Sequence, residues 1–600
     1  MTVKVCMGNE AIALGALAAG VSVAAGYPGT PSTEIIETLA HLHRPGVSVQ
    51  WSVNEKAALE VAAGAAYAGA RSLCTMKQVG LNVASDPLMS LSYIGVKGGM
   101  VIAVADDPGP WSSQTEQDTR GFAKHANLPV FDPSSPEEAY MMVQTAYEFS
   151  EKYSLPVFMR PTTRVCHASA DVELSEPAEI KKPGGFERRP EWCIFPALSY
   201  RRHGELEVKQ YEMARDFDSM PYNRIEGSGR KGVAVSGVSY LYAKEAVSEL
   251  GADVALYKAG TPYPLPEKMT KDFLASVDSV LVIEELDPVV EEQLLTEAAG
   301  KVPVLGKRSG DMPKNGEYSF EIVKEALIKY LALPQPQPEK EAEALPQLPV
   351  RPPVLCAGCP HRASFYAAKV ASKGFKKSVY CGDIGCYTLG NAAPLNMVDT
   401  CLCMGAGITL AQGIALADKD AKCFAFIGDS TFFHTGIPGV INAVYQGTDI
   451  TIIVLDNHTT AMTGHQPHPG TGKRADGSDA QALDIETLLR ACGVEHVSNV
   501  DPFDFPATVK AIKEAAEFPG VSAVIARAPC IAQIKKPASV RFVNNGCIKC
   551  GRCVAEIGCP AITPDNTGRA VINAPLCTDC GLCAFVCPVS AIERGERNAD

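Results

Sequence analysis

The pattern of hydrophobic and polar positions along the chain predicts alternating strands and helices. Met100–Ala105 is an uninterrupted apolar run, and Lys422–Ile427 and Ile450–Leu455 are mostly apolar. Strands that are apolar on both faces are typical of parallel sheets covered by helices on both sides. The small-residue segment Ala57–Ala70 predicts one such helix. We therefore expect an α/β fold built on doubly wound parallel sheets.

The same pattern divides the 600 residues into five parts. Residues 1–190 form a first α/β domain, and 191–332 hold a connecting region with some helix and a smaller α/β domain. Residues 333–353 are rich in proline and predict an extended linker. A further α/β domain covers 354–539. A cysteine-rich α+β module of residues 540–600 follows it.

Composition limits the kinds of partner that the chain can bind and the cellular compartment in which it is expected. A net charge of −13 and a pI near 5.5 argue against binding to nucleic acid. Residues 11–33 are uncharged, but their glycines and prolines favour a helix, a turn and a strand end over a membrane span. The cysteines outside the last module are mostly scattered singly along apolar segments. We therefore expect a cytoplasmic protein in a reducing environment.

Eight cysteines near the end of the chain fall into two runs that each open C-x2-C-x2-C and end in Cys-Pro. This spacing matches two-cluster ferredoxins, in which the fourth cysteine of each run binds the other cluster. We assign one 4Fe–4S cluster to Cys547, Cys550, Cys553 and Cys587, and a second to Cys577, Cys580, Cys583 and Cys559. Five residues separate Cys553 from Cys559 where three are usual, so the extra Ile557-Gly558 is expected to bulge the loop. Paired C-x2-C motifs also bind zinc, but four cysteines per run argue against it.

Two strand ends in the 354–539 domain carry oxygen ligands. Gly428-Asp429-Ser430 follows one predicted strand, and Asp456-Asn457 ends the next. Adjacent parallel strands end at the same edge of a sheet, so Asp429 and Asn457 are expected to lie together. Carboxylate, amide and backbone carbonyl oxygens suit Mg²⁺ with phosphate as a further ligand. In the first domain, Glu55 lies between a predicted strand and a predicted helix. On its own, this position favours a helix-capping role for Glu55.

Further motifs lie in both of the larger α/β domains: Gly26–Ser32, Glu55, Thr75–Asn82, Asp106–Gly109, Ser112–Asp118, Cys356–Arg362, Asp383–Thr388 and Asp399–Gly407. Together these motifs resemble the 2-oxoacid:ferredoxin oxidoreductases, most closely the large (alpha) subunit of the indolepyruvate type. Ser430 and Asp456 depart from the usual Gly-Asp-Gly and Asn-Asn of the thiamine diphosphate motif. The resemblance covers nearly the whole chain and is weakest over 171–230 and the linker.

The resemblance implies thiamine diphosphate and Mg²⁺. Residues 1–190 would be the pyrimidine-binding domain, 354–539 the diphosphate-binding domain, and the smaller α/β domain transketolase C-terminal-like. Glu55 would activate the cofactor, with Thr30 and Arg120 at the substrate carboxylate, although a loop arginine is as often a surface residue. Mg²⁺ would be bound by Asp429, Asn457 and Thr459. The expected cofactor-binding residues are Gly428, Asp429, Ser430, Asn457, Thr459, Met404 and Gly405.

The resemblance also implies a reaction and partners. An aryl 2-oxoacid such as indolepyruvate or phenylpyruvate would be oxidatively decarboxylated to an acyl-coenzyme A, with electrons passing to an external ferredoxin. A separate beta subunit would complete an alpha2beta2 heterotetramer. Pyruvate or a branched 2-oxoacid is the alternative substrate, and a non-oxidative thiamine decarboxylase or an electron-transfer subunit is the alternative function. A third 4Fe–4S cluster is expected at four further cysteines: Cys356, Cys359, Cys386 and Cys530, with Cys381 as a possible replacement for Cys386.

Overall fold

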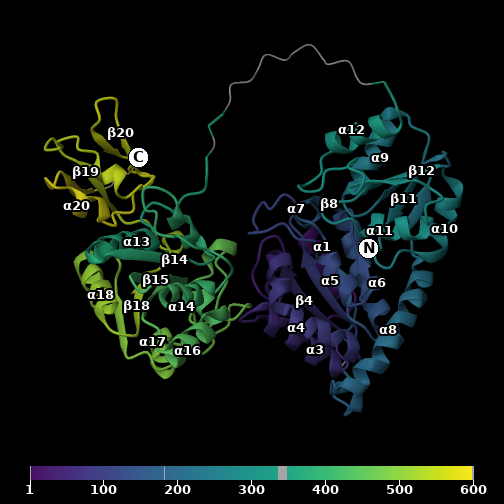
Figure 1. Ribbon diagram of the computed structural model, residues 1–600, viewed down its shortest axis with the longest axis horizontal. Coiled ribbons are helices and arrows are strands. Elements are labelled where there is room, and N and C mark those ends of the chain that lie inside the picture. Colours follow the sequence, from purple (N-terminus) through teal and green to yellow (C-terminus); the bar gives the residue numbers. More distant parts are fainter. Residues whose placement is uncertain (1, 177, 181–182, 335–347, 350, 597–600) are drawn as a thin grey trace. The chain divides into compact units, whose positions relative to one another are not determined.

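The computed structural model describes residues 2–176, 178–180, 183–334, 348–349 and 351–596. The chain divides into two compact units, residues 1–344 and residues 345–600 (Figure 1). Most of the predicted linker, residues 335–347 and 350, lies outside the described residues. None of the helices among the described residues is long and apolar enough to cross a membrane.

The first domain of unit 1 is a six-stranded sheet in the order β3-β2-β4-β5-β7-β6, with every pair of neighbours parallel. Helix α1 packs against both α2 and α6, and α4 packs against both α3 and α5. A separate antiparallel pair joins β1 and β8. The strands are β1 Thr2–Met7, β2 Val23–Gly26, β3 Ser48–Trp51, β4 Ser72–Lys77, β5 Met100–Ala105, β6 Val130–Phe131, β7 Val157–Met159 and β8 Ser169–Leu174. The helices are α1 Gly8–Ala18, α2 Thr33–His41, α3 Glu55–Tyr67, α4 Gln78–Ile94, α5 Thr119–His125, α6 Pro136–Tyr153 and α7 Thr163–His167.

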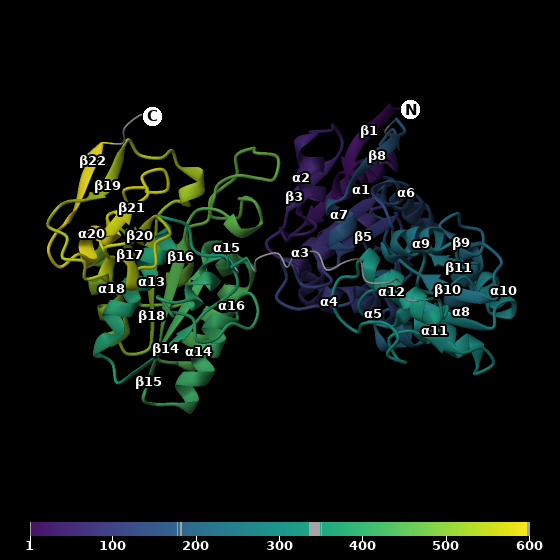
Figure 2. The same ribbon diagram turned by 90° about the horizontal axis from the view of Figure 1, so that it is seen from above.

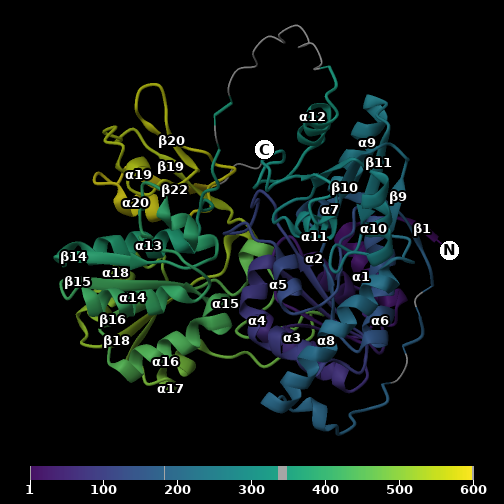
Figure 3. The ribbon, with the colours of Figure 1, turned by 45° about the vertical axis from the view of Figure 1, so that its right-hand side comes forward.

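The second domain of unit 1 is a smaller sheet in the order β13-β12-β10-β11-β9, antiparallel only at its β9 edge. The long helix α8 (Pro196–Phe217) precedes it and packs against α4 and α10 (Figure 3). The strands are β9 Asn223–Glu226, β10 Lys231–Val235, β11 Val254–Ala259, β12 Ser279–Ile283 and β13 Val304–Leu305. The helices are α9 Ser239–Leu250, α10 Glu267–Ser276, α11 Val289–Ala298 and α12 Phe320–Tyr330.

Unit 2 contains a five-stranded parallel sheet in the order β14-β15-β16-β18-β17. Helices α13 and α18 share one hydrophobic core, and α14, α16 and α17 share the other. The strands are β14 Lys377–Cys381, β15 Ala421–Gly428, β16 Ile450–Asp456, β17 His496–Val500 and β18 Val521–Arg527. The helices are α13 Pro360–Ala371, α14 Ala406–Ala417, α15 Asp429–Thr431, α16 Ile437–Gln446, α17 Ile485–Ala491 and α18 Phe505–Glu517.

The cysteine-rich module closes unit 2 and packs on α13 and α18 (Figure 2). Its two sheets are antiparallel pairs, β19 with β22 and β20 with β21. The Phe585 ring lies 4.2 Å from that of Phe505 on α18, so the module shares the core of the larger domain. The elements are β19 Ser539–Val543, α19 Arg552–Ala555, β20 Ile562–Pro564, β21 Ala570–Ile572, α20 Leu582–Val586 and β22 Ile592–Glu596.

The expected α/β class with doubly wound parallel sheets is confirmed. The apolar run Met100–Ala105 coincides with β5, which is entirely buried. The helix predicted at 57–70 is α3, which begins two residues earlier because the Asn54 side chain accepts the Ala57 amide at 2.9 Å and caps its N-terminus.

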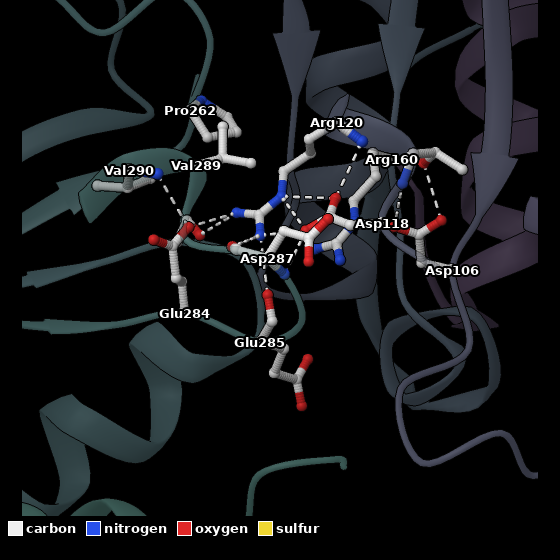
Figure 4. Close-up of polar contacts among 12 residues, drawn as sticks. Asp106, Asp118, Arg120, Arg160, Pro262, Glu284, Glu285, Asp287, Val289 and Val290 are labelled. Atoms are coloured by element: carbon white, nitrogen blue, oxygen red, sulfur yellow. Dashed lines mark hydrogen bonds and ion pairs between the residues drawn. The ribbon is translucent and has the colours of Figure 1, made fainter. Parts of the chain in front are cut away.

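Buried charged side chains join the two domains of unit 1 (Figure 4). Arg120, on α5, has no exposed surface and bonds Asp118 of its own domain and Glu284 of the second domain, the latter at 2.9 Å. Beside it, Arg160 bonds Asp106 of its own domain at 2.7 Å. Burial alone would raise the pKa of Asp118, but the guanidinium groups of Arg120 and Arg160 lower it below its usual range. The contact between these domains therefore depends on charges that neutralise one another.

Removing the charge of Arg120 should destabilise unit 1 strongly. Arg120→Met leaves Asp118 and Glu284 buried without their partner, a change that costs about 3–5 kcal/mol. Arg164 is the matched control, since it also pairs across the two domains, with Glu317 at 2.8 Å, but is 55% exposed. Arg164→Met should cost less than about 1 kcal/mol. All three tryptophans, Trp51, Trp111 and Trp192, lie in unit 1, so their fluorescence in urea measures its unfolding in the full chain. Equal losses for the two variants would contradict the expectation.

Candidate active site

The carboxyl ends of adjacent strands in the first domain gather polar side chains. Thr30 follows β2, Glu55 follows β3, and Lys77 ends β4. Glu55 is 5% exposed and packs so closely on Gly80 that a Cβ there would lie 2.5 Å from Glu55 Oε1. Only glycine leaves room for the carboxylate at this position. Glu55 is therefore buried at this edge of the sheet, and the cap of helix α3 is Asn54 and not Glu55.

Thr30 and Lys77 are connected through one loop. Ser112 Oγ donates to the Thr30 carbonyl at 2.9 Å, and Lys77 Nζ donates to the Ser112 carbonyl at 3.1 Å. The Lys77 stem runs along Gly29, where a Cβ would lie 2.8 Å from Lys77 Cδ. Burial lowers the pKa of Lys77, and the carboxylates of Asp107 and Glu55 oppose that shift. Lys77 lies within the Thr75–Asn82 motif, but nothing in the sequence distinguished it as a functional residue.

The structure does not support the prediction that Arg120 binds the substrate carboxylate. Its Nε and Nη2 donate to Asp118, and Nη1 donates to Ser236 Oγ at 3.2 Å and to Glu284. Nη2 also donates to the carbonyls of Glu285 and Asp287 at 2.8 and 2.9 Å. An arginine has five N–H donors, and all of these are directed at protein acceptors. Arg120 joins two domains, and the position of a loop arginine in sequence could not reveal that.

In unit 2 the predicted pair at the ends of β15 and β16 is adjacent. Gly428 pairs with Leu455, so the residues that follow each strand meet at one edge. Asp429 Oδ2 accepts the Asn457 amide at 3.1 Å, and its Oδ1 accepts the Ser430 amide at 2.8 Å. The Asn457 side-chain oxygen accepts the Thr459 amide at 3.2 Å. The structure therefore brings together the three residues predicted to bind Mg²⁺.

Asp429 remains ionised although it is buried. Burial alone would raise its pKa, but the hydrogen bond from His468 and the Ser430 amide hold the pKa below its usual value. His468 Nε2 lies 3.1 Å from Asp429 Oδ2. A buried carboxylate that stays charged next to amide oxygen suits a hard divalent cation. The donor set therefore fits Mg²⁺ and a diphosphate.

Two histidines near this pair were missed by the sequence analysis. His468 contacts Asp429, and His361 Nε2 lies 3.4 Å from Asn457 Nδ2. Burial lowers the pKa of His361 to about 4, so its ring is neutral at physiological pH. Its Nδ1 is buried without a partner among the described residues. His361 follows Cys359-Pro360 directly, and that position in a cysteine motif was the available signal.

Met404 and Gly405 lie over the helix that Asp429 begins. The Gly405 amide donates to both carboxyl oxygens of Asp383 at 2.8 Å, and Thr435 Oγ1 donates to the Met404 carbonyl at 2.7 Å. Gly405 has φ +84°, and a Cβ there would lie 2.1 Å from Thr435 Oγ1. Thr435 belongs to a π-helical turn, Phe432–Gly436, a feature frequent at functional sites. Glycine is therefore required where this loop closes on the helix.

The eight ferredoxin-type cysteines surround two separate cavities, divided as the spacing predicts. One cavity is lined by Cys559, Cys577, Cys580 and Cys583 of the module, and also by Cys359. The other is lined by Cys547, Cys550, Cys553 and Cys587. Each run thus contributes its last cysteine to the other run's cavity. Four soft sulfur ligands around one cavity fit a 4Fe–4S cluster.

Contacts within unit 2 connect the four cysteines predicted to bind a third cluster. Cys386 lies close enough to Cys530 and Cys356 that their charges act on its thiol, and burial raises its pKa to about 11. Cys530 follows β18, and its amide donates to the Asn457 carbonyl at 3.1 Å. The Cys359 amide donates to the Cys356 carbonyl at 3.3 Å, and Cys359 also lines the cavity of Cys559, Cys577, Cys580 and Cys583. Cys359 therefore lies between the other proposed ligands of the third cluster and the cysteine-rich module.

Comparison with known families and proteins agrees with this geometry. Residues 14–212 match the family "Pyruvate flavodoxin/ferredoxin oxidoreductase, thiamine diP-bdg". Residues 383–526 match "Thiamine pyrophosphate enzyme, C-terminal TPP binding domain", and residues 570–593 match "4Fe-4S binding domain". These matches confirm the predicted thiamine diphosphate and 4Fe–4S cofactors.

Curated relatives match over nearly their whole length. The indolepyruvate oxidoreductase subunit IorA of Archaeoglobus fulgidus is 42% identical, with 99% of this chain and 97% of that protein covered. IorA of Pyrococcus abyssi is 43% identical, covering 98% and 96%. Among solved structures, 2-oxoglutarate:ferredoxin oxidoreductase from Magnetococcus marinus is 18% identical, with a TM-score of 0.46, over 55% of this chain and 65% of that chain. The chain therefore belongs to the IorA family of indolepyruvate oxidoreductase subunits, which are 2-oxoacid:ferredoxin oxidoreductases.

Proposed function

We propose that this chain, with a separate beta subunit in an alpha2beta2 heterotetramer, oxidatively decarboxylates an aryl 2-oxoacid to its coenzyme A thioester. Indolepyruvate and phenylpyruvate are the proposed substrates, and an external ferredoxin receives the electrons. One observation carries the proposal: the same chain holds an ionised strand-end carboxylate beside Asn457 and eight cysteines around two cavities. An electron carrier gives no reason for the first feature, and a non-oxidative decarboxylase gives none for the second.

The proposal that the substrate carries an aryl side chain is supported by the relatives, which are named as subunits of indolepyruvate oxidoreductase. Their name as subunits also supports a partner chain. Small α/β scaffolds of one type serve many substrates, so the side chain must be tested directly. Pyruvate or a branched 2-oxoacid is the second candidate.

Each predicted residue has a definite part in this proposal. Asp429, Asn457 and Thr459 would hold Mg²⁺, and Gly428, Ser430, Met404 and Gly405 would contact the thiamine diphosphate. Bound thiamine diphosphate supplies a carbon nucleophile for the 2-oxo carbon and takes up the electrons left when carbon dioxide departs. The Glu55 carboxyl would hold a proton at the aminopyrimidine ring, and Thr30 would orient the substrate carboxylate. We also retain the third cluster, at Cys356, Cys386 and Cys530 with Cys359 as the fourth proposed ligand.

The function is tested by anaerobic turnover of the full chain with its beta subunit. Reduction of a viologen dye should require both the 2-oxoacid and coenzyme A, and kcat/KM should be higher for aryl 2-oxoacids than for pyruvate. The chain without a beta subunit should show no coenzyme A-dependent turnover. Aldehyde formation without dye reduction would instead select the decarboxylase, and the absence of any turnover would select an electron carrier.

Glu55 and Asp429 should have separable effects. Glu55→Gln preserves shape but cannot exchange a proton, so kcat should fall by at least about 100-fold while the Kd for thiamine diphosphate stays unchanged. Asp429→Asn removes the charged metal ligand and should raise that Kd. Both constants can be measured by calorimetry and by dye reduction. Glu60→Gln, at an exposed position on the same helix as Glu55, is the control. Near-normal kcat in Glu55→Gln would refute the assignment.

Lys77 is the cation that we propose for the substrate carboxylate in place of Arg120. Its ammonium group has three donors, and only the bond to the Ser112 carbonyl is found among the described residues. Lys77→Met should raise KM for the 2-oxoacid by about 10- to 100-fold, because a charge-assisted hydrogen bond contributes about 1.5–3 kcal/mol. Lys77→Arg should recover part of the loss. Lys97→Met, which removes a partly exposed ammonium group beside Glu187, should leave KM unchanged. An unchanged KM in Lys77→Met would exclude the role.

A further inference from the structure

The two residues inserted between Cys553 and Cys559 form a specific contact. The carbonyls of Ile557 and Gly558 both accept hydrogen bonds from Arg362 Nη1, at 2.8 and 2.9 Å. Arg362 lies on α13 of the larger domain in unit 2, and its Nη2 donates to the Leu355 carbonyl. A cysteine run of the usual length would lack these two carbonyls. The insertion therefore provides the acceptors that bind the cysteine-rich module to α13.

The backbones approach closely on both sides of this contact. Gly558 has φ +61°, and a Cβ there would lie 2.3 Å from Pro394 Cδ. Gly358 has φ +71°, and a Cβ there would lie 1.7 Å from Thr578 Oγ1. Glycine is thus required in both loops. The loop that holds Cys356 and Cys359 is therefore fixed against the module.

Arg362 is a buried cation with only neutral hydrogen-bond acceptors. It is 4% exposed, its three acceptors are carbonyls, and its Nε is buried without a partner. Among the described residues, no carboxylate lies within ion-pair distance of it. Burial lowers the pKa of Arg362, and the thiolates of Cys559 and Cys359 oppose this shift more than any other group. The groups that interact most strongly with the positive charge of Arg362 are therefore cysteine sulfur atoms.

The guanidinium lines one of the two cysteine cavities. Arg362 and four cysteines of the module, Cys559, Cys577, Cys580 and Cys583, border the same cavity. Arg541 borders it too, but it forms an ion pair with Asp579 at 2.6 Å, a carboxylate that Arg594 also contacts. The other cavity is bordered by Lys549, which is exposed to solvent. Of the two cavities, only the first has a buried and uncompensated cation among the described residues.

We propose that Arg362 raises the reduction potential of the 4Fe–4S cluster held by Cys559, Cys577, Cys580 and Cys583, so that this cluster accepts its electron at a higher potential than it would without the arginine. The cluster gains one electron and one negative charge on reduction, and no bond forms or breaks. A nearby positive charge in a poorly solvated site stabilises the more negative state. Arg362 acts on the cluster through its positive charge. This inference rests on the proposed function, because it requires that these cysteines bind a cluster.

The test is an EPR-monitored redox titration of the full chain with its beta subunit, loaded with iron and sulfide. In Arg362→Gln one one-electron step should move to lower potential by about 59 mV, a tenfold fall in the ratio of reduced to oxidised cluster, while the other steps stay in place. Arg362→Lys keeps the charge and should remain near the wild type. Arg490→Gln, at a surface arginine paired with Glu486 on the same unit, should shift nothing.

The outcomes separate this inference from the proposed function. Absence of 4Fe–4S signals from the wild-type protein would refute the function. Normal wild-type signals with no step moved in Arg362→Gln would refute the inference alone. An equal shift in the Gln and Lys variants, or equal loss of iron from both, would show that the guanidinium shape and not its charge matters, and would also overturn the proposal.

Discussion

Parallel pairing of neighbouring strands is the constraint on which the polar clusters at the strand ends of both units depend. In a parallel sheet every strand reaches the same edge with its carboxyl end, so residues distant in sequence meet there without any further device. The register of Gly428 with Leu455 brings Asp429 to the Asn457 amide. Parallel β2, β3 and β4 likewise bring Thr30, Glu55 and Lys77 to one edge of unit 1. The loops add only the side chains that the chemistry requires.

This constraint explains why much of the architecture could be predicted. Apolar runs locate buried strands, and the residue after each run is then placed at a known edge, as Asp429 and Asn457 show. Cysteine spacing is equally informative, because each C-x2-C-x2-C run must wrap one cavity and its fourth cysteine reaches the other. In each case a local pattern determines a position through geometry that every such sheet or cysteine run shares.

Arg120, Lys77 and Arg362 show where sequence reasoning fails. All three are cations near functional motifs, and their sequence neighbourhoods do not distinguish them. Their partners do: Arg120 bonds two carboxylates, Lys77 bonds one carbonyl, and Arg362 bonds three carbonyls. Those partners come from segments up to about 200 residues away, such as Ile557 for Arg362. Only the tertiary fold decides whether a buried charge is neutralised.

Neutralisation in turn decides what a buried charge can do. A cation that already pairs with two carboxylates, as Arg120 does, has little field left for a third group, and its contribution is to hold two segments together. A cation held by carbonyl dipoles keeps its full charge, which then acts on whatever changes charge nearby. Carbonyls orient the Arg362 guanidinium without cancelling it. The two-residue insertion at Ile557-Gly558 thus lets one arginine join two domains and still exert an unpaired charge at the cysteine cavity.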